Sequence, residues 1–264
     1  MIAAWAAIGV TAALGILFAA FRLENRRFKV TQTAIRHRKI QKPFRVVQVS
    51  DLHDRAFGKE QSKLLSAIQS AKPDFIVVTG DLFNRHNQNA TKNALAFAER
   101  VVSIAPTYFI EGNHECSLGD VGERDIKAVE GFGVRVLRNA CVDRSECRLI
   151  GLKQHAEPEV LKNLMDPNRF NLVLAHRPER FPLYAGVGAD VVLSGHAHGG
   201  QIRLFNRGIY APQQGLFPKF TTGLYRIGAS TMYLSRGLGN TIVTPRIFNT
   251  PELNVLDFEP VRGE

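Results

Sequence analysis

Aspartate, histidine and asparagine recur directly after short apolar segments of this chain. In chain order the motifs are Asp51-Leu52-His53, Gly80-Asp81, Gly112-Asn113-His114-Glu115, an isolated His176, and Gly195-His196-Ala197-His198. Carboxylate, amide oxygen and imidazole ligands together suit Mn²⁺, iron or Zn²⁺ better than Ca²⁺ or Cu(I). A single Gly-Asp is usually a turn, and a single histidine is more often a hydrogen-bonded core residue. Five such motifs in succession instead indicate one metal site.

Alternating strands and helices are expected to position these motifs. Strands are predicted at 44–49, 75–79, 107–110, 171–175 and 191–194, and helices at 58–72 and 89–104. Short strands are expected over 134–152, and strands with long loops after residue 200. This alternation predicts an α/β fold, in which functional groups gather beyond the carboxyl ends of the strands. Burying carboxylates and imidazoles together without a counter-charge is costly, so metal ions are expected there.

The motifs DLH, GD, GNHE, an isolated H and GHAH resemble those of the calcineurin-like metallophosphoesterases in order and rough spacing, over residues 44–258. The resemblance implies a four-layer α/β/β/α sandwich, made of two packed sheets flanked by helices. It also implies a binuclear metal centre. The first metal would be held by Asp51, His53 and His198. The second would be held by Asn113, His176 and His196, and Asp81 would bridge the two.

The reaction that follows from this resemblance is hydrolysis of a phosphodiester or pyrophosphate bond. Two metal ions, of Mn, Fe or Zn, lying ~3.5–4 Å apart would clamp a phosphate and lower the pKa of a bridging water. The resulting metal-activated hydroxide would attack phosphorus in line. His114 would not bind metal; it would donate a proton to the leaving oxygen or stabilise its charge.

Other residues are weaker candidates for the same site. Asn84, three residues past Asp81, could reach a phosphate oxygen from the same loop. Several cations could contact phosphate, although in a basic protein most are solvated surface charges: Arg55, Arg85, Arg177, Lys219 and Arg236. The glycines that precede the ligands are expected to let the chain turn tightly, namely Gly80, Gly112 and Gly195.

Further segments resemble a membrane-anchored bacterial branch of this family. They are HGGQ at 198–201, FPK at 217–219, TTGLY at 221–225, SRGLG at 235–239, RIFN at 246–249, and Pro251-Glu252. Relatives in that branch include phosphodiesterases of broad specificity and hydrolases of UDP-2,3-diacylglucosamine in lipid A assembly. The resemblance therefore makes a lipid-linked substrate a candidate. Four aromatic side chains are expected either to line a lipid-facing rim or to pack in the core: Phe205, Phe217, Phe220 and Tyr225.

The N-terminal residues predict attachment to a membrane. Residues 2–21 carry no charge, and ~20 apolar residues is the length that a helix needs to cross a bilayer. Basic residues follow at once, and cationic flanks tend to stay cytoplasmic. We expect a transmembrane anchor at 1–21, a basic linker at 22–43 and a phosphoesterase domain at 44–264 on the cytoplasmic face of the cell membrane. A cleaved signal peptide lacks support, because no basic residue precedes the apolar run. A buried hydrophobic helix with a solvated linker is the other alternative.

Composition limits the remaining alternatives. The formal net charge of +10 favours anionic partners. A nuclease or other nucleotide phosphodiesterase is the alternative function, but no basic stripe interleaved with aromatics is present to stack single strands. Nucleic acid is therefore not the expected partner, and no obligate protein partner is implied. A non-catalytic metal-binding scaffold should have lost ligands, whereas every ligand position is filled here. The three cysteines are expected to be free thiols rather than to form a Cys141–Cys147 disulfide.

Overall fold

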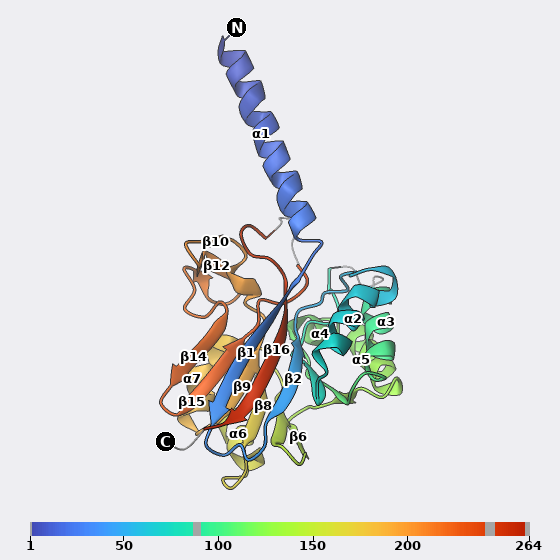
Figure 1. The fold of residues 1–264 in the computed structure, drawn as a ribbon, viewed down its shortest axis with the longest axis vertical. Helices are drawn as coiled ribbons and strands as arrows, with labels where there is room; N and C mark the ends of the chain where they lie inside the picture. Colours follow the sequence, from blue (N-terminus) through green and yellow to red (C-terminus); the bar gives the residue numbers. More distant parts are fainter. Residues whose placement is uncertain (1, 87–90, 241–245, 262–264) are drawn as a thin grey trace.

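The computed structural model describes residues 2–86, 91–240 and 246–261 of the 264-residue chain. Its body is built on two six-stranded sheets that pack face to face (Figure 1). The strand order is β1-β16-β2-β3-β4-β5 in the first sheet and β14-β15-β9-β8-β7-β6 in the second. Most neighbouring strands in both sheets run parallel.

The strands of the first sheet are β1 (Lys29–His37), β2 (Phe44–Val49), β3 (Phe75–Val78), β4 (Thr107–Phe109), β5 (Arg135–Val136) and β16 (Glu252–Pro260). The strands of the second are β6 (Ala140–Asp143), β7 (Arg148–Gly151), β8 (Asn171–Leu174), β9 (Val191–Ser194), β14 (Gly223–Ile227) and β15 (Ser230–Leu234). Two small hairpins lie outside the sheets and pair β10 (Arg203–Leu204) with β11 (Arg207–Gly208), and β12 (Tyr210–Ala211) with β13 (Gly215–Leu216).

Helices cover the outer face of each sheet. Those beside the first sheet are α2 (Ser62–Ala71), α3 (Lys92–Val101), α4 (Asn113–Ser117) and α5 (Asp120–Gly131). Those beside the second are α6 (Pro158–Leu164) and α7 (Phe181–Gly186). Single 3-10 turns are η1 (Lys59–Gln61), η2 (Pro178–Arg180) and η3 (His198–Gly200).

Three apolar clusters produce this layering. Successive side chains of a strand point to opposite faces, so Val47 and Val49 of β2 pack under α2 and α3, while Val46 faces the second sheet. The cluster between the sheets includes Phe44 and Phe258, whose stacked rings lie 4.8 Å apart. A third cluster joins the outer face of the second sheet to α6 and α7. The predicted α/β sandwich is therefore confirmed.

The linker predicted at 22–43 is wrong over the residues of β1. Residues 29–37 form an edge strand that runs parallel to β16 over its full length, from Lys29 beside Glu252 to His37 beside Pro260. Two of the basic residues that suggested a linker pair with acidic side chains of β16. Lys29 Nζ lies 3.3 Å from Glu252 Oε2, and Arg36 Nε lies 3.0 Å from Glu259 Oε2. Most side chains of β1 are polar and at least partly exposed, so its sequence resembles that of a solvated linker.

The N-terminal helix α1 (Ile2–Glu24) projects from one end of the sandwich (Figure 1). It ends at Glu24, beyond the expected end at residue 21. Among the described residues, no helix has the length and apolar character to cross a bilayer, which leaves the transmembrane anchor expected at 1–21 without support. At the base of α1, Phe21 is buried and its ring lies 5.2 Å from that of Phe248.

The other predicted elements agree with the structure to within a few residues. The strands at 44–49 and 191–194 are confirmed as β2 and β9. The helix predicted at 58–72 begins at Ser62, because Glu60 and Gln61 have left-handed backbones. The helix predicted at 89–104 spans Lys92–Val101, and its expected first two residues lie outside the described ones. All three cysteines are free thiols, as predicted, and burial raises the pKa of Cys147 to about 12.

Candidate dinuclear metal centre

The predicted ligands converge at one end of the two sheets. Asp51 and Asp81 follow the neighbouring strands β2 and β3, and Asn113 opens α4 after β4. His176 and His196 follow β8 and β9 of the second sheet. The backbone N–H of His196 donates to Asp51 Oδ1 at 2.9 Å, which joins the loops of the two sheets directly. The expected gathering of functional groups beyond the strand ends is therefore present.

Two groups of buried side chains can each hold a metal ion. Asp51, His53, Asp81 and His198 each offer a ligand atom, and these atoms lie within 4.8 Å of one another. The same holds for Asp81, His176 and His196. Asn113 adds an amide oxygen to the second group, since its Oδ1 lies 3.2 Å from His176 Nε2. Asp81 is common to both groups. The grouping agrees with the ligand sets implied by the resemblance, and the individual assignments stay predictions.

The backbone at the site is strained to aim these side chains. Five predicted ligands have positive φ angles, namely Asp51, His53, Asp81, His196 and His198. Left-handed backbone is uncommon outside glycine and persists where the surroundings enforce it, often at functional sites. Gly80 also has a positive φ, as expected for a tight turn. Gly112 and Gly195 do not, so a left-handed backbone is not the reason for glycine at these two positions. Gly112 is needed for close approach, because a Cβ there would lie 2.0 Å from Asp81 Oδ1.

Asp81 and His176 form the strongest electrostatic pair of the site. His176 Nε2 lies 3.3 Å from Asp81 Oδ2, and both side chains are buried. Burial lowers the pKa of His176, but the charge and hydrogen bond of Asp81, together with Asp51 and the Thr79 carbonyl oxygen, outweigh burial and raise it to about 9. Burial likewise raises the pKa of Asp81, yet His176 and its neighbours hold it well below its usual range. Burial raises the pKa of Asp51 to about 6. Buried negative charge at the site thus attracts cations.

The remaining histidines have the protonation state that a metal requires. Burial lowers the pKa of His53 and His196 to about 3, and that of His198 well below its usual value. Neutral imidazole offers a lone pair to a metal. His53 Nε2 is buried, faces Asp81 Oδ2 at 3.8 Å and has no hydrogen-bond partner among the described residues. A cation between these atoms would satisfy both, so the residues fit the dinuclear centre.

Glu115 fixes the loops that carry two of the ligands. Its buried carboxylate accepts hydrogen bonds from the backbone N–H groups of Asp81 at 2.9 Å, Gly112 at 2.6 Å and Phe83 at 2.9 Å. Burial raises the pKa of Glu115 to about 7, while these donors favour its charged form. The sequence contained Glu115 within the GNHE motif but gave no sign of this positioning role.

Arg246 links the end of α1 to the metal site. Its buried guanidinium donates to the carbonyl oxygen of Arg236 at 2.7 Å and also to that of Gly239. Its Nη2 lies 3.1 Å from His198 Nδ1. Its backbone exchanges two hydrogen bonds with the side chain of Asn25, at 2.8 and 2.9 Å. Arg246 thus restrains His198, the loop at 236–239 and Asn25, the residue that follows α1.

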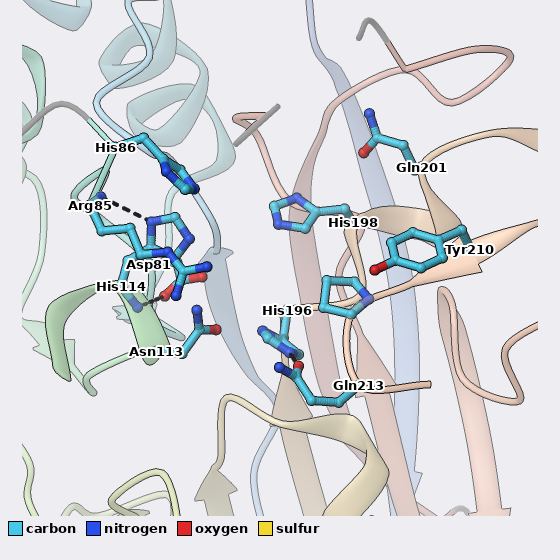
Figure 2. A pocket seen from close by; sticks show the side chains of 11 residues that line it. Asp81, Arg85, His86, Asn113, His114, His196, His198, Gln201, Tyr210 and Gln213 are labelled. Atoms are coloured by element: carbon cyan, nitrogen blue, oxygen red, sulfur yellow. Dashed lines mark hydrogen bonds between the residues drawn. The ribbon is translucent and has the colours of Figure 1, made fainter. Parts of the chain in front are cut away.

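A cavity of about 270 Å³ opens over the ligands. Its lining residues are Asp81, Arg85, His86, Asn113, His114, His196, His198, Gln201, Tyr210, Pro212 and Gln213. Figure 2 shows the side chains of Arg85, His86 and His114 across the cavity from Tyr210 and Gln213. The wall on the Tyr210 side comes from the hairpin β12–β13, which has no ligand motif. Sequence reasoning missed it because nothing in the sequence relates that hairpin to the metal ligands.

His114 lies in the cavity wall beside the ligands. The backbone N–H of Arg85 donates to His114 Nδ1 at 3.1 Å (Figure 2). A backbone N–H can only donate, so Nδ1 carries a lone pair and the neutral ring holds its proton on Nε2. Burial lowers the pKa of His114 to about 4. At neutral pH the ring therefore presents an N–H hydrogen-bond donor rather than an acidic proton.

Of the weaker candidates for substrate contact, some line the cavity and others do not. Asn84 is not among the residues that line the cavity, and its Oδ1 accepts a hydrogen bond from the His86 N–H at 3.0 Å. Its proposed contact with substrate stays a prediction without structural support. Arg85 does line the cavity. Arg236 instead lies 3.4 Å from Glu252 Oε2, and Arg177 donates to Gln154 Oε1 at 2.7 Å.

We expect Gln213→Ala to weaken metal binding. Gln213 Oε1 contacts His196 Nε2, which leaves His196 Nδ1 facing the second group, 3.1 Å from His176 Nε2. Removing such a supporting partner typically lowers metal affinity by about 10–100-fold. Titration of the metal-free protein with Mn²⁺, followed by calorimetry, measures the effect. Gln69→Ala on the exposed face of α2 is the control, and equal Mn²⁺ affinity of both variants would contradict the role of Gln213.

Comparison with known proteins agrees with this site. A family model described as calcineurin-like phosphoesterase matches residues 44–200, more than half of the chain. The metallophosphoesterase YkuE of Bacillus subtilis is 29% identical over 273 residues, which cover 97% of this chain and 93% of YkuE. The phosphodiesterase YaeI of Escherichia coli is 28% identical over 235 residues, covering 81% and 82% of the two chains.

A longer relative shares the same region. The metallophosphoesterase Cj0846 of Campylobacter jejuni is 29% identical over 235 residues, which cover 83% of this chain and 60% of that protein. This chain thus spans less than two thirds of the Campylobacter protein. The chain belongs to the calcineurin-like phosphoesterase family, and its buried aspartates and histidines are arranged to bind the dimetal centre of a phosphoester hydrolase.

Proposed function

We propose that this protein hydrolyses phosphodiester or pyrophosphate bonds at the cavity over Asp81. The observation that carries the proposal is the sharing of Asp81 by two buried donor groups directly below an open polar cavity. Similarity to YaeI, a phosphodiesterase by name, supports a diester as the substrate class.

In this proposal each group of side chains has a separate task. Asp51, His53 and His198 would hold one divalent metal, Asn113, His176 and His196 would hold the other, and Asp81 would serve both. Bound Mn, Fe or Zn ions supply positive charge to the phosphate oxygens and lower the pKa of a water molecule. Arg85 and His86, on the exposed rim of the cavity, are placed to orient the phosphate.

His114 stabilises the leaving group by hydrogen bonding. The Arg85 N–H fixes the proton of the neutral His114 ring on Nε2. The backbone N–H of His114 also donates to Asp81 Oδ1 at 2.9 Å, which holds the residue at the edge of the ligand cluster. Of the two roles expected from the sequence, proton transfer and charge stabilisation, this arrangement favours the second.

The first test concerns Asp81. Full-length protein supplied with Mn²⁺ should hydrolyse bis-p-nitrophenyl phosphate, and Asp81→Asn should lower kcat/KM by more than ~10²-fold, because the shared carboxylate charge is lost. Metal content should fall in the same variant, as measured by inductively coupled plasma mass spectrometry. Asp120→Asn, on the exposed first turn of α5, is the matched control. Wild-type activity in Asp81→Asn would contradict the mechanism.

The second test separates the two roles of His114. His114→Ala should slow hydrolysis of an alkyl phosphodiester by ~10²–10³-fold, because a poor leaving group needs its developing charge stabilised. Hydrolysis of the p-nitrophenyl ester should slow much less. His86→Ala, which alters the same wall, should lower both rates by a similar factor. Equal losses on both esters in His114→Ala would show that the residue does not act on the leaving oxygen.

The finer proposal is a lipid-linked substrate, such as UDP-2,3-diacylglucosamine, met at the cytoplasmic face of the cell membrane. Its support is α1, which projects from the sandwich and exposes large apolar side chains including Trp5, Ile16 and Leu17. The exposed Arg26 and Arg27 follow that helix directly. Basic residues beside an apolar helix favour association with the anionic cytoplasmic leaflet.

A substrate screen tests this finer proposal. The full-length protein in detergent is offered UDP-2,3-diacylglucosamine, glycerophosphodiesters, phosphomonoesters, cyclic nucleotides and single-stranded DNA. The lipid-linked pyrophosphate is expected to give the highest kcat/KM, because its acyl chains add apolar contacts that the soluble esters lack. A preference for DNA or cyclic nucleotides would overturn the proposal in favour of the nuclease or nucleotide phosphodiesterase alternative.

A further inference from the structure

Two hairpins beside the cavity expose large apolar side chains. In β10–β11, Phe205 is 100% exposed and its neighbour Leu204 is also exposed. In β12–β13 and the residue after it, Leu216 is 70% and Phe217 is 77% exposed. Keeping such side chains in water costs ~25 cal/mol per Å² of apolar surface, and adjacent exposed apolar residues typically mark a contact surface. Phe220, another aromatic of this region, packs inside, with its ring 5.0 Å from Tyr225.

The first hairpin is connected to the base of α1 through Ile202. Ile202, at the start of the first hairpin, pairs with Ile247 in an isolated bridge. The next residue, Phe248, is exposed and contacts Phe21 of α1. In Figure 1 the labels β10 and β12 lie at the end of the sandwich from which α1 projects. The hairpins and α1 therefore offer apolar side chains at the same end of the molecule.

The segment that carries the hairpins has only basic residues among its charged ones. Residues 191–251 contain no aspartate or glutamate, and their basic residues are Arg203, Arg207, Lys219, Arg226, Arg236 and Arg246. Arg207 and Lys219 are exposed next to the apolar tips. Apolar tips flanked by cations fit the interface of an anionic bilayer, where each cation near the surface contributes ~1 kcal/mol. A protein partner would need acidic groups arranged to match these cations, whereas anionic headgroups supply them without a fixed geometry.

One of the two hairpins, β12–β13, forms part of the cavity. Tyr210, Pro212 and Gln213 of β12–β13 line it (Figure 2), while Leu216 and Phe217 of the same segment are exposed. We propose that β10–β11 and β12–β13 rest in the interface of an anionic bilayer, with Phe205 and Phe217 among the lipid headgroups. Docking there holds the cavity wall at the depth of the lipid phosphates. The benefit to catalysis rests on the proposed function, whereas the docking itself does not.

Tryptophan fluorescence in the full chain tests the docking directly. Trp5 is the chain's single tryptophan, so Trp5→Phe combined with Phe205→Trp places one probe at the hairpin tip. With phosphatidylglycerol-containing vesicles the emission should shift to the blue, and brominated phospholipid should quench it. Both effects should be weaker with pure phosphatidylcholine, because Arg207 and Lys219 then lack anionic headgroups.

A probe at the opposite end provides the control. Trp5→Phe with Val261→Trp carries one probe at an exposed residue directly after β16. That end of β16 lies beside His37, at the end of β1 far from α1. This probe should not respond to vesicles. Vesicle binding without a shift at residue 205 would overturn the proposal, since α1 alone would then hold the protein. A shift that needs no vesicles and grows with protein concentration would also overturn it, in favour of contact between two copies of the chain.

A double substitution measures the strength of docking. Phe205→Ser with Phe217→Ser should weaken binding to anionic vesicles by at least ~10-fold, because two large apolar side chains no longer leave water. Unaltered vesicle binding of this variant would contradict the proposal. Rates with soluble bis-p-nitrophenyl phosphate report separately on the metal site. A chain that fails to hydrolyse any ester yet shows the shift at residue 205 would refute the proposed function and retain the docking surface.

Discussion

The burial of Asp81 between two sets of histidines is the constraint on which the rest of the site depends. A carboxylate removed from water needs positive charge or hydrogen-bond donors close by. His176 and the backbone N–H of His114 supply part of this, and the arrangement leaves His53 Nε2 facing the carboxylate with no partner among the described residues. The loops therefore converge on a position that cations would complete. Glu115 and Arg246 hold these loops in place through hydrogen bonds within the protein.

Most of the ligand cluster could be predicted from the sequence, because each ligand lies in a short motif directly after a strand. Strands are short and apolar here, and parallel neighbours bring their carboxyl ends to one edge. The residues that shape the cavity could not be predicted in this way. Gln213 and Tyr210 lie in a hairpin outside both sheets, and its position depends on contacts with loops far away in sequence. Asn84 shows the opposite case, since nearness in sequence to Asp81 did not bring it to the cavity.

The strand β1 was predicted to be a linker for a related reason. Alternation of β-branched and polar residues at 29–37 is a strand pattern, but basic residues and an apolar N-terminal segment dominate the local composition. The partner of the strand, β16, is more than 200 residues away in sequence, from Lys29 beside Glu252 onward. Backbone pairing with β16 across that distance, accompanied by two ion pairs, makes a basic segment the edge of a sheet. Composition describes a segment on its own, whereas pairing depends on the whole chain.

Asn25, which directly follows α1, is part of the hydrogen-bond network that supports the metal centre. Its side chain exchanges two hydrogen bonds with the backbone of Arg246, whose guanidinium reaches His198. Arg55 also donates to the Asn25 carbonyl oxygen at 2.7 Å. A fragment cut after residue 43 would therefore lack an edge strand and one support of the metal centre. The N-terminal helix is therefore not an independent module, because the residue that follows it on the sandwich side, Asn25, is hydrogen-bonded to Arg246 and Arg55 of the body of the protein.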